Sequence, residues 1–239
     1  MINVICVKWG DKYNYEHVNR LHYMVKKNLT LPFNFYCLTE DSSNLKDINI
    51  IPIKHNNLEV WWNKLAMFEK GFGNLKGKCL FFDLDVIIQN NIDEIANFKT
   101  KGLCKISSYW KPESVLNEEN FDMRRNSSCL IWEADTLDFI WEYFRKDDEF
   151  FMLKYKGIDR FLYWERELRE HIETFPEEWF YSRVYGDGET DGQIVTDKYK
   201  NDLRINMFDR PERKVCLLNG LDKQFTEEEM LKGMDVYYR

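Results

Sequence analysis

Two aspartates one residue apart, Asp83 and Asp85, are the side chains in this sequence best suited to chemistry. They follow an uninterrupted apolar run, Cys79–Phe82, which is typical of a strand covered on both faces. Because burying unpaired charges is costly, we expect both carboxylates to be paired or to bind a cation. Carboxylate oxygens suit a hard divalent ion such as Mg²⁺ or Mn²⁺. The pattern therefore indicates a metal or phosphate role, and the alternative is an acidic strand end that faces solvent.

The elements around this strand alternate between strand-like and helix-like patterns. The predicted strands are 4–7, 33–38, 48–53, 78–82, 103–107 and 128–132, and the predicted helices are 15–27, 60–71, 136–144 and 160–172. From Phe175 onward the sequence is loop-rich, apart from an apolar run at 215–218. Alternation of this kind predicts an α/β protein with a mostly parallel sheet. Such sheets bind ligands beyond the carboxyl ends of their strands, which is where the two aspartates stand.

Composition excludes several classes of protein. The 239 residues include 34 Lys and Arg against 41 Asp and Glu, for a net charge of −7, and the two signs are interspersed. A nucleic-acid binder would need a basic stripe. No apolar run approaches the roughly 18–20 residues of a membrane span, and the first residues do not resemble a signal peptide. The six cysteines form no C-x-x-C pair. We therefore expect a soluble cytoplasmic protein with reduced, buried thiols that binds no nucleic acid.

Several segments of the chain carry a family resemblance. Over the first hundred residues they are Val4–Tyr13, Val18–Leu21, Phe35–Glu40, Trp61–Leu65 and Leu80–Val86. Together they resemble a bacterial and phage group of GT-A glycosyltransferases with a D-x-D motif, related to the glycogenin-like and galactosyltransferase-like retaining enzymes.

The match continues more loosely in the second half of the chain. Asn126–Trp132 is similar to the family's second central strand. Gly157–Arg160 departs from the usual Gly-Asp-Gln by one inserted residue and by Arg for Gln. Val215–Lys223 resembles the closing Phe-His-Gly-x-x-Lys segment, with Asn219 where His is usual.

The resemblance implies a fold and an activity. The fold is GT-A, a Rossmann-like mixed and mostly parallel central sheet flanked by helices. The activity is metal-dependent transfer of a hexose from a nucleotide-diphosphate sugar, with a UDP-sugar as the expected donor, to a saccharide or other hydroxyl acceptor. We expect one domain over residues 1–239, in which 1–100 bind the nucleotide sugar and 101–239 bind the acceptor and close the site.

The same resemblance assigns the donor site. It implies that the base and ribose are framed by Val7, Lys8, Trp9 and Tyr13. Asp85 would coordinate Mn²⁺ or Mg²⁺ directly, while Asp83 would hold the ribose and share the metal. Lys64 and Lys223 would add positive charge at the phosphates, and the alternative for both lysines is a solvated surface charge.

Three further residues have two interpretations each. Asn219 is either a third metal ligand or a turn residue before Gly220. The resemblance places Gly220 in the same closing segment, among the donor-binding residues. Asp159 either orients an acceptor hydroxyl or supplies a carboxylate at a helix N-terminus. Asn126 either touches the donor sugar or serves local backbone hydrogen bonds.

Aromatic pairs such as Trp61-Trp62 could supply an acceptor platform, because rings pack on pyranose faces. Most of these rings are expected in the core.

A haloacid-dehalogenase-like phosphatase is an alternative. In that interpretation Asp83 is the phosphoryl-accepting nucleophile, Asp85 is the general acid/base and Gly186–Asp191 binds magnesium. Against it, some eighty residues precede Asp83, and 179–185 make a poor buried strand.

A non-catalytic nucleotide- or sugar-binding domain is the third hypothesis. It is motivated by Asn219 and by the altered Gly157–Arg160 segment.

Overall fold

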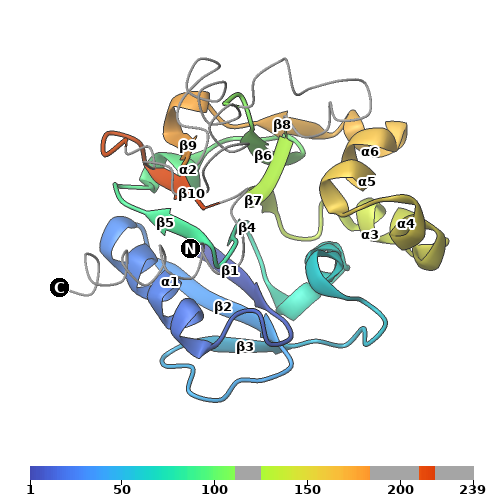
Figure 1. Cartoon of the computed structure of the whole chain (residues 1–239), viewed down its shortest axis with the longest axis horizontal. Helices are drawn as coiled ribbons and strands as arrows, with labels where there is room; N and C mark the ends of the chain where they lie inside the picture. Colours follow the sequence, from blue (N-terminus) through green and yellow to red (C-terminus); the bar gives the residue numbers. More distant parts are fainter. Residues whose placement is uncertain (111–124, 184–209, 219–239) are drawn as a thin grey trace, which may run out of the picture.

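A seven-stranded sheet forms the centre of the molecule (Figure 1). The computed structural model describes residues 1–110, 125–183 and 210–218. The strand order is β3-β2-β1-β4-β7-β6-β8. The strands are β1 (Ile2–Lys8), β2 (Phe33–Thr39), β3 (Asn49–Pro52), β4 (Lys78–Phe82), β6 (Leu103–Ser107), β7 (Arg125–Glu133) and β8 (Ile172–Thr174). Within this sheet β7 is antiparallel to both of its neighbours and the other pairs are parallel. The predicted α/β class, the mostly parallel sheet and the central place of 78–82 are confirmed.

A second sheet of three strands adjoins the aspartates. Its order is β5-β10-β9, from β5 (Val86–Ile88), β10 (Val215–Leu217) and β9 (Phe180–Ser182). Strand β10 is antiparallel to β5 and parallel to β9. Of residues 179–185, Phe180–Ser182 form strand β9 beside β10, and all three are buried, so the expectation of a poor buried strand was wrong for these residues.

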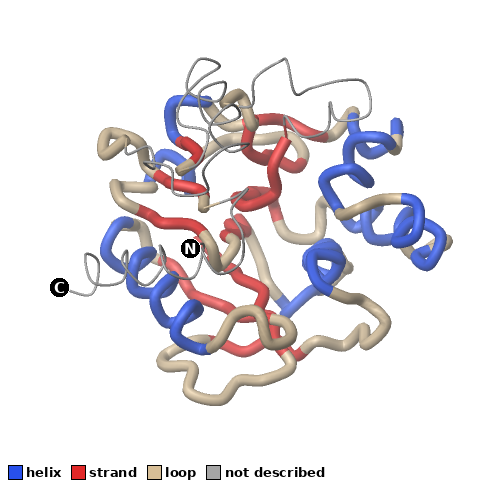
Figure 2. Tube along the Cα trace, in the orientation of Figure 1, coloured by secondary structure: helices blue, strands red, loops and turns tan. Residues whose placement is uncertain are grey.

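Helices cover both faces of the large sheet (Figures 1 and 2). They are α1 (Tyr15–Asn28), η1 (Val60–Phe68), η2 (Phe72–Asn74), α2 (Asp93–Asn97), α3 (Asp138–Phe144), α4 (Asp148–Lys154), α5 (Ile158–Trp164), α6 (Arg166–Arg169) and η5 (Glu177–Trp179). Side chains alternate along each strand, so Val4 of β1 joins the apolar cluster under α1, while Ile5 joins the cluster under η1, α3, α4 and α5. Figure 1 shows α1 and the α3–α6 group on opposite sides of the molecule.

Helix α1 begins as its sequence predicts. The Asn14 side chain caps it by accepting from the Glu16 amide at 3.0 Å. Its apolar residues recur every three or four positions, and Val18, Leu21 and Val25 are fully buried. This packing fixes α1 beside β5 and brings its first turn to the edge of the sheet that carries the aspartates.

Two predicted helices have a different form. Residues 60–71 form a 3₁₀ helix that ends at Phe68, because Trp62–Phe68 are buried on every side and the segment has no amphipathic 3.6-residue pattern. Residues 160–172 form two short helices, α5 and α6, separated by an extended Glu165, and β8 begins at Ile172.

Two negative expectations concern thiols and membranes. All six cysteines are buried, as predicted. None of the helices in the described ranges combines the length and the apolar character needed to cross a bilayer.

Glu165, where the helical pattern breaks, is held by hydrogen bonds from other elements. Its carboxylate accepts hydrogen bonds from Tyr155 at 2.5 Å, from Tyr143 at 2.7 Å and from Lys154 at 3.0 Å. Burial alone would raise the pKa of Glu165, but these three donors outweigh it and hold that pKa below its ordinary value. The side chain thereby ties α3, α4 and α5 together.

We predict that Glu165→Gln lowers the free energy of unfolding by about 1–2 kcal/mol at pH 7. A depressed pKa in the folded state gives stability that is present above the unfolded-state pKa and is lost as the pH falls through the folded-state pKa. The gap between wild type and Glu165→Gln should therefore close in acid. Urea unfolding at pH 7 and below pH 4 measures it, with the exposed Glu170→Gln as control. A gap that is independent of pH would contradict the prediction.

Candidate active site

Asp83 and Asp85 lie directly after β4, at the carboxyl end of the sheet's central strand. Both are half-buried, while Leu84 between them is buried. The Asp83 amide donates to the Ser128 carbonyl at 2.9 Å, which continues the β4–β7 ladder past the end of β4. Since β7 runs opposite to β4, its first residues lie at the edge where β4 ends. The carboxylates therefore face residues from the beginning of β7.

Lys64 of η1 is the partner of Asp83. Its ammonium lies 2.7 Å and 2.8 Å from the two carboxylate oxygens, and its side chain is only 11% exposed. Burial raises the pKa of Asp83, the Lys64 charge opposes this, and the neighbouring Asp85 adds to the rise. The prediction that Lys64 belongs to the site is supported by this contact, and the alternative of a solvated surface lysine is wrong.

Asp85 has a different partner. The Tyr13 hydroxyl donates to its carboxylate at 3.0 Å. Burial, followed by the charge of Asp85, raises the pKa of Tyr13, so the phenol stays a neutral donor. The two aspartates are thus held by groups from two different elements, η1 for Asp83 and the loop before α1 for Asp85.

Asp159, in the first turn of α5, joins the same group through a serine. Its carboxylate forms an ion pair with Lys105 of β6 and accepts from the Ser127 hydroxyl at 3.4 Å. Ser127 in turn lies 3.4 Å from the Lys64 ammonium. The pairing of β6 with β7 shifts register between Lys105 and Ile106, opposite the part of β7 that carries Ser127. Asp159 is therefore linked to Lys64 and Asp83 through Ser127.

Two buried cations were missed from the sequence. Lys105 is fully buried within β6, and burial lowers its pKa against the opposing charge of Asp159. Arg20 of α1 is fully buried too, and its guanidinium donates to the Leu84 carbonyl at 3.1 Å. The available signals were a lysine inside an apolar strand and an arginine four residues before the buried Met24, on the inner face of α1. Neither signal identifies the partner.

The other residues predicted to bind the donor lie at the end of β1 and at the start of β7. Val7, Lys8 and Trp9 lie at the carboxyl end of β1, next to β4. The Lys8 ammonium lies 3.7 Å from the carboxylate of Asp41. Asn126 uses its side-chain oxygen to accept from the Ser128 amide at 2.8 Å, which is the local bond that its alternative interpretation expected.

Part of the predicted site cannot be placed. Asn219, Gly220 and Lys223 lie outside the described residues, as does the Gly186–Asp191 segment of the phosphatase hypothesis. The described chain reaches Leu218, whose amide donates to the Asp85 carbonyl at 3.2 Å.

The donor set of the aspartates suits a divalent ion. Asp83 and Asp85 offer hard carboxylate oxygens on adjacent half-buried side chains. Within the ranges that the structure describes, no group of three or more His, Cys, Asp or Glu is arranged to hold a metal. The two carboxylates have the oxygen chemistry that Mg²⁺ or Mn²⁺ prefers.

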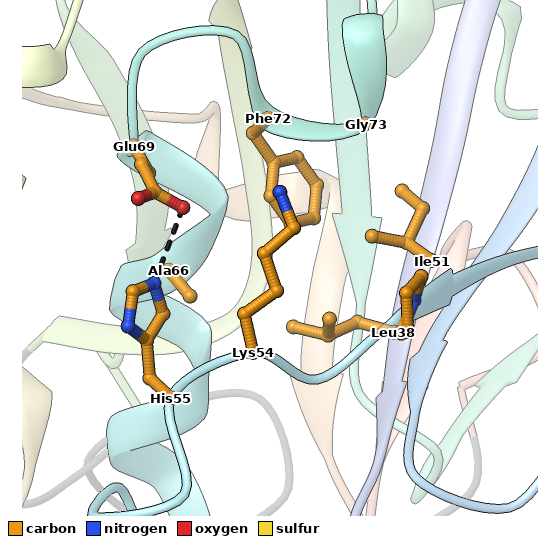
Figure 3. Close-up of a pocket in the computed structure, with 9 residues that line it drawn as sticks. Leu38, Ile51, Lys54, His55, Ala66, Glu69, Phe72 and Gly73 are labelled. Carbon is orange, nitrogen blue, oxygen red and sulfur yellow. Dashed lines mark hydrogen bonds and ion pairs between the residues drawn. The ribbon is translucent and has the colours of Figure 1, made fainter.

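A small pocket lies apart from these residues (Figure 3). Its lining is Leu38, Ile51, Pro52, Lys54, His55, Ala66, Glu69, Phe72 and Gly73. His55 lies 3.2 Å from Glu69, and Lys54 extends across the pocket toward Phe72 (Figure 3). None of the predicted site residues lines this pocket, so we do not assign the pocket to the candidate active site.

We predict that Arg20→Met lowers the free energy of unfolding by roughly 1–3 kcal/mol, because the Leu84 carbonyl loses a buried charged donor. The exposed Arg166→Met should stay within about 0.5 kcal/mol of wild type. Chemical denaturation of the three proteins measures both values. Equal stability of Arg20→Met and Arg166→Met would show that the Leu84 contact contributes nothing.

Sequence comparison yields no relatives, since no family model and no curated protein matches this chain significantly. Comparison with solved structures, in contrast, finds similar proteins. The glycosyltransferase GlyE of Streptococcus pneumoniae TIGR4 superposes with a TM-score of 0.64 and 10% identity over 99% of this chain. The chain spans 63% of GlyE, just under two thirds of its length.

Two further glycosyltransferases superpose over most of both chains. The galactosyltransferase LgtC, solved in complex with donor and acceptor sugar analogues, has a TM-score of 0.59 and 9% identity over 95% of this chain and 94% of LgtC. A glycosyltransferase involved in glycosylation of the major capsid of PBCV-1 has a TM-score of 0.50 and 9% identity over 97% and 98%. The chain therefore has the GT-A glycosyltransferase fold that its motifs predict.

Proposed function

We propose that this protein is a metal-dependent glycosyltransferase that moves a hexose from a nucleotide-diphosphate sugar, most simply a UDP-sugar, to a saccharide acceptor. One observation carries the proposal. In a fold shared with known glycosyltransferases, two carboxylates stand at the carboxyl end of the central strand, and a buried lysine is paired to the first of them.

The donor's diphosphate accounts for the charges. A chain with a net charge of −7 needs a local cation to bind an anion. Asp85 and Asp83 would hold Mn²⁺ or Mg²⁺, which when bound neutralises the leaving diphosphate. Lys64 adds a second positive charge beside them. Asn219 and Lys223 would complete this group, and the hydrogen bond between Leu218 and Asp85 supports that assignment.

The base and ribose fit the loop after β1. Val7, Lys8, Trp9 and Tyr13 come from that strand and its loop, and Tyr13 already contacts Asp85. The loop is held by the Gly10 amide, which donates to Glu40 at 2.6 Å with Gly10 at a φ of 63°. Stacking of a base on the half-buried Trp9 ring would contribute roughly 1–3 kcal/mol.

The acceptor side has an exposed ring. Trp61 is 45% exposed, whereas Trp62 is buried. In a 3₁₀ helix residues three apart eclipse, so Trp61 shares a face with Lys64. A β-carbon built on Gly157 would lie 3.0 Å from the Trp61 indole nitrogen, so this ring packs against the residue two positions before Asp159. An exposed ring that packs against Gly157 and shares a helix face with Lys64 supports a saccharide acceptor, since pyranoses stack on aromatics.

The donor prediction is tested by thermal shift. UDP, GDP, CMP and dTDP sugars are screened with and without Mn²⁺, and we expect one family to raise the Tm of wild type only with metal. Asp85→Ala should abolish that metal-dependent rise and sugar transfer. Glu170→Ala, at an exposed carboxylate, should keep both.

Two results would overturn the proposal. Asp83-dependent release of phosphate from p-nitrophenyl phosphate would favour the phosphatase hypothesis. Metal-independent nucleotide binding that survives Asp85→Ala would favour a non-catalytic binding domain.

The acceptor prediction uses two exposed tryptophans. With the best acceptor from a panel of p-nitrophenyl hexosides, Trp61→Ala should raise the acceptor KM about 10-fold or more, because it loses a stacking surface. Hydrolysis of the donor by water should be unchanged. Trp164→Ala, 42% exposed at the other end of α5, should match wild type. An unchanged acceptor KM in Trp61→Ala would remove Trp61 from the site.

A further inference from the structure

We infer that Lys105 is a positioning residue of this site: its buried ammonium fixes the Asp159 carboxylate and keeps it away from Lys64, so that Lys64 stays with Asp83 and the donor's diphosphate. The inference rests on the proposed transferase function and adds to it a residue that the family resemblance does not assign.

The environment of Lys105 is that of a core residue. It is 0% exposed, its neighbours Cys104 and Ile106 are buried, and its cross-strand partner is Leu130. Its ammonium is paired to the Asp159 carboxylate, whose side chain is 32% exposed. The lysine is therefore the desolvated member of the pair, and the aspartate is the member that reaches solvent.

Stability does not explain a lysine at this position. Taking an ammonium out of water is costly, and replacing both members of a buried ion pair by apolar side chains usually causes no loss of stability. Here the carboxylate that remains without Lys105 is 32% exposed, so water can solvate it. A methionine would fit a strand position that faces Leu130. A residue that costs stability in the core of a fold is most simply explained by the site that it serves.

The contacts around Lys105 indicate how it acts on the site. Asp159 bonds Lys105 through one oxygen and Ser127 through the other, Ser127 bonds Lys64, and Lys64 bonds Asp83. Lys64 therefore lies one hydroxyl away from a second carboxylate. Without Lys105, Asp159 would still have Lys64 one hydroxyl away, and two aspartates would compete for that ammonium. Lys105 prevents this competition by giving Asp159 a cation of its own.

The test compares Lys105→Met with wild type in Tm, in donor-induced thermal shift and in steady-state kinetics, using the nucleotide sugar that wild type binds. We expect a Tm equal to or above that of wild type and a kcat about 100-fold lower, because a misplaced catalytic carboxylate costs about that much. The double variant Lys105→Met/Asp159→Asn should be no slower than the slower single variant, since residues acting as a unit are non-additive.

A matched control comes from the other end of the sheet. Lys78 begins β4 and donates to the Phe98 carbonyl at 3.0 Å, so Lys78→Met removes a strand lysine far from the aspartates. It should keep wild-type kcat.

Two results would overturn the inference while wild type turns over. One is a wild-type kcat in Lys105→Met. The other is a fall in Tm and kcat together that Lys105→Met/Asp159→Asn restores together, which would assign Lys105 to folding. If wild type binds none of the nucleotide sugars, the proposed function fails first and the inference fails with it.

Discussion

The ion pair between Lys64 and Asp83 is the contact on which the rest of the site depends. It joins η1 to the end of β4, and it sets a positive charge beside carboxylates that would otherwise repel each other. Three residues from different elements surround this pair. Tyr13 contacts the neighbouring Asp85, Ser127 contacts Lys64, and Asp159 contacts Ser127. The site therefore forms only when the chain is folded, because each of these partners comes from a different element.

Sequence patterns predicted the elements that depend on local information. The apolar run before Asp83 identified β4 and its central place, and the spacing of Val18, Leu21 and Val25 identified α1. The predictions of β4 and α1 succeeded because a buried strand and an amphipathic helix leave a signature in neighbouring residues. The family resemblance pointed to Lys64, Tyr13 and Asp159, and contacts with the aspartates or with Ser127 place these residues at one edge of the sheet.

The remainder depends on contacts between distant residues. Glu165 lies where a helical pattern is interrupted, and its carboxylate accepts hydrogen bonds from Tyr143 of α3 and from Tyr155 at the end of α4, which no local rule predicts. The segment 179–185 looks too polar for a buried strand, yet its residues in β9 pair with β10 and are buried. Arg20 and Lys105 stand out in the sequence as charges at buried positions, but their partners Leu84 and Asp159 are set by the fold. Local pattern thus predicts that such charges need partners and not which ones they find.

The pairing of β5 with β10 has a consequence for the order in which the site forms. Val86, next to Asp85, pairs with Leu217 near the far end of the described chain, and the Leu218 amide holds the Asp85 carbonyl. A ribosome releases Asp85 long before it releases Leu218, and contacts between such distant residues close late in folding. The nascent chain therefore carries its aspartates with one side untethered until synthesis has passed residue 218, so that this edge is among the last parts to acquire its final geometry.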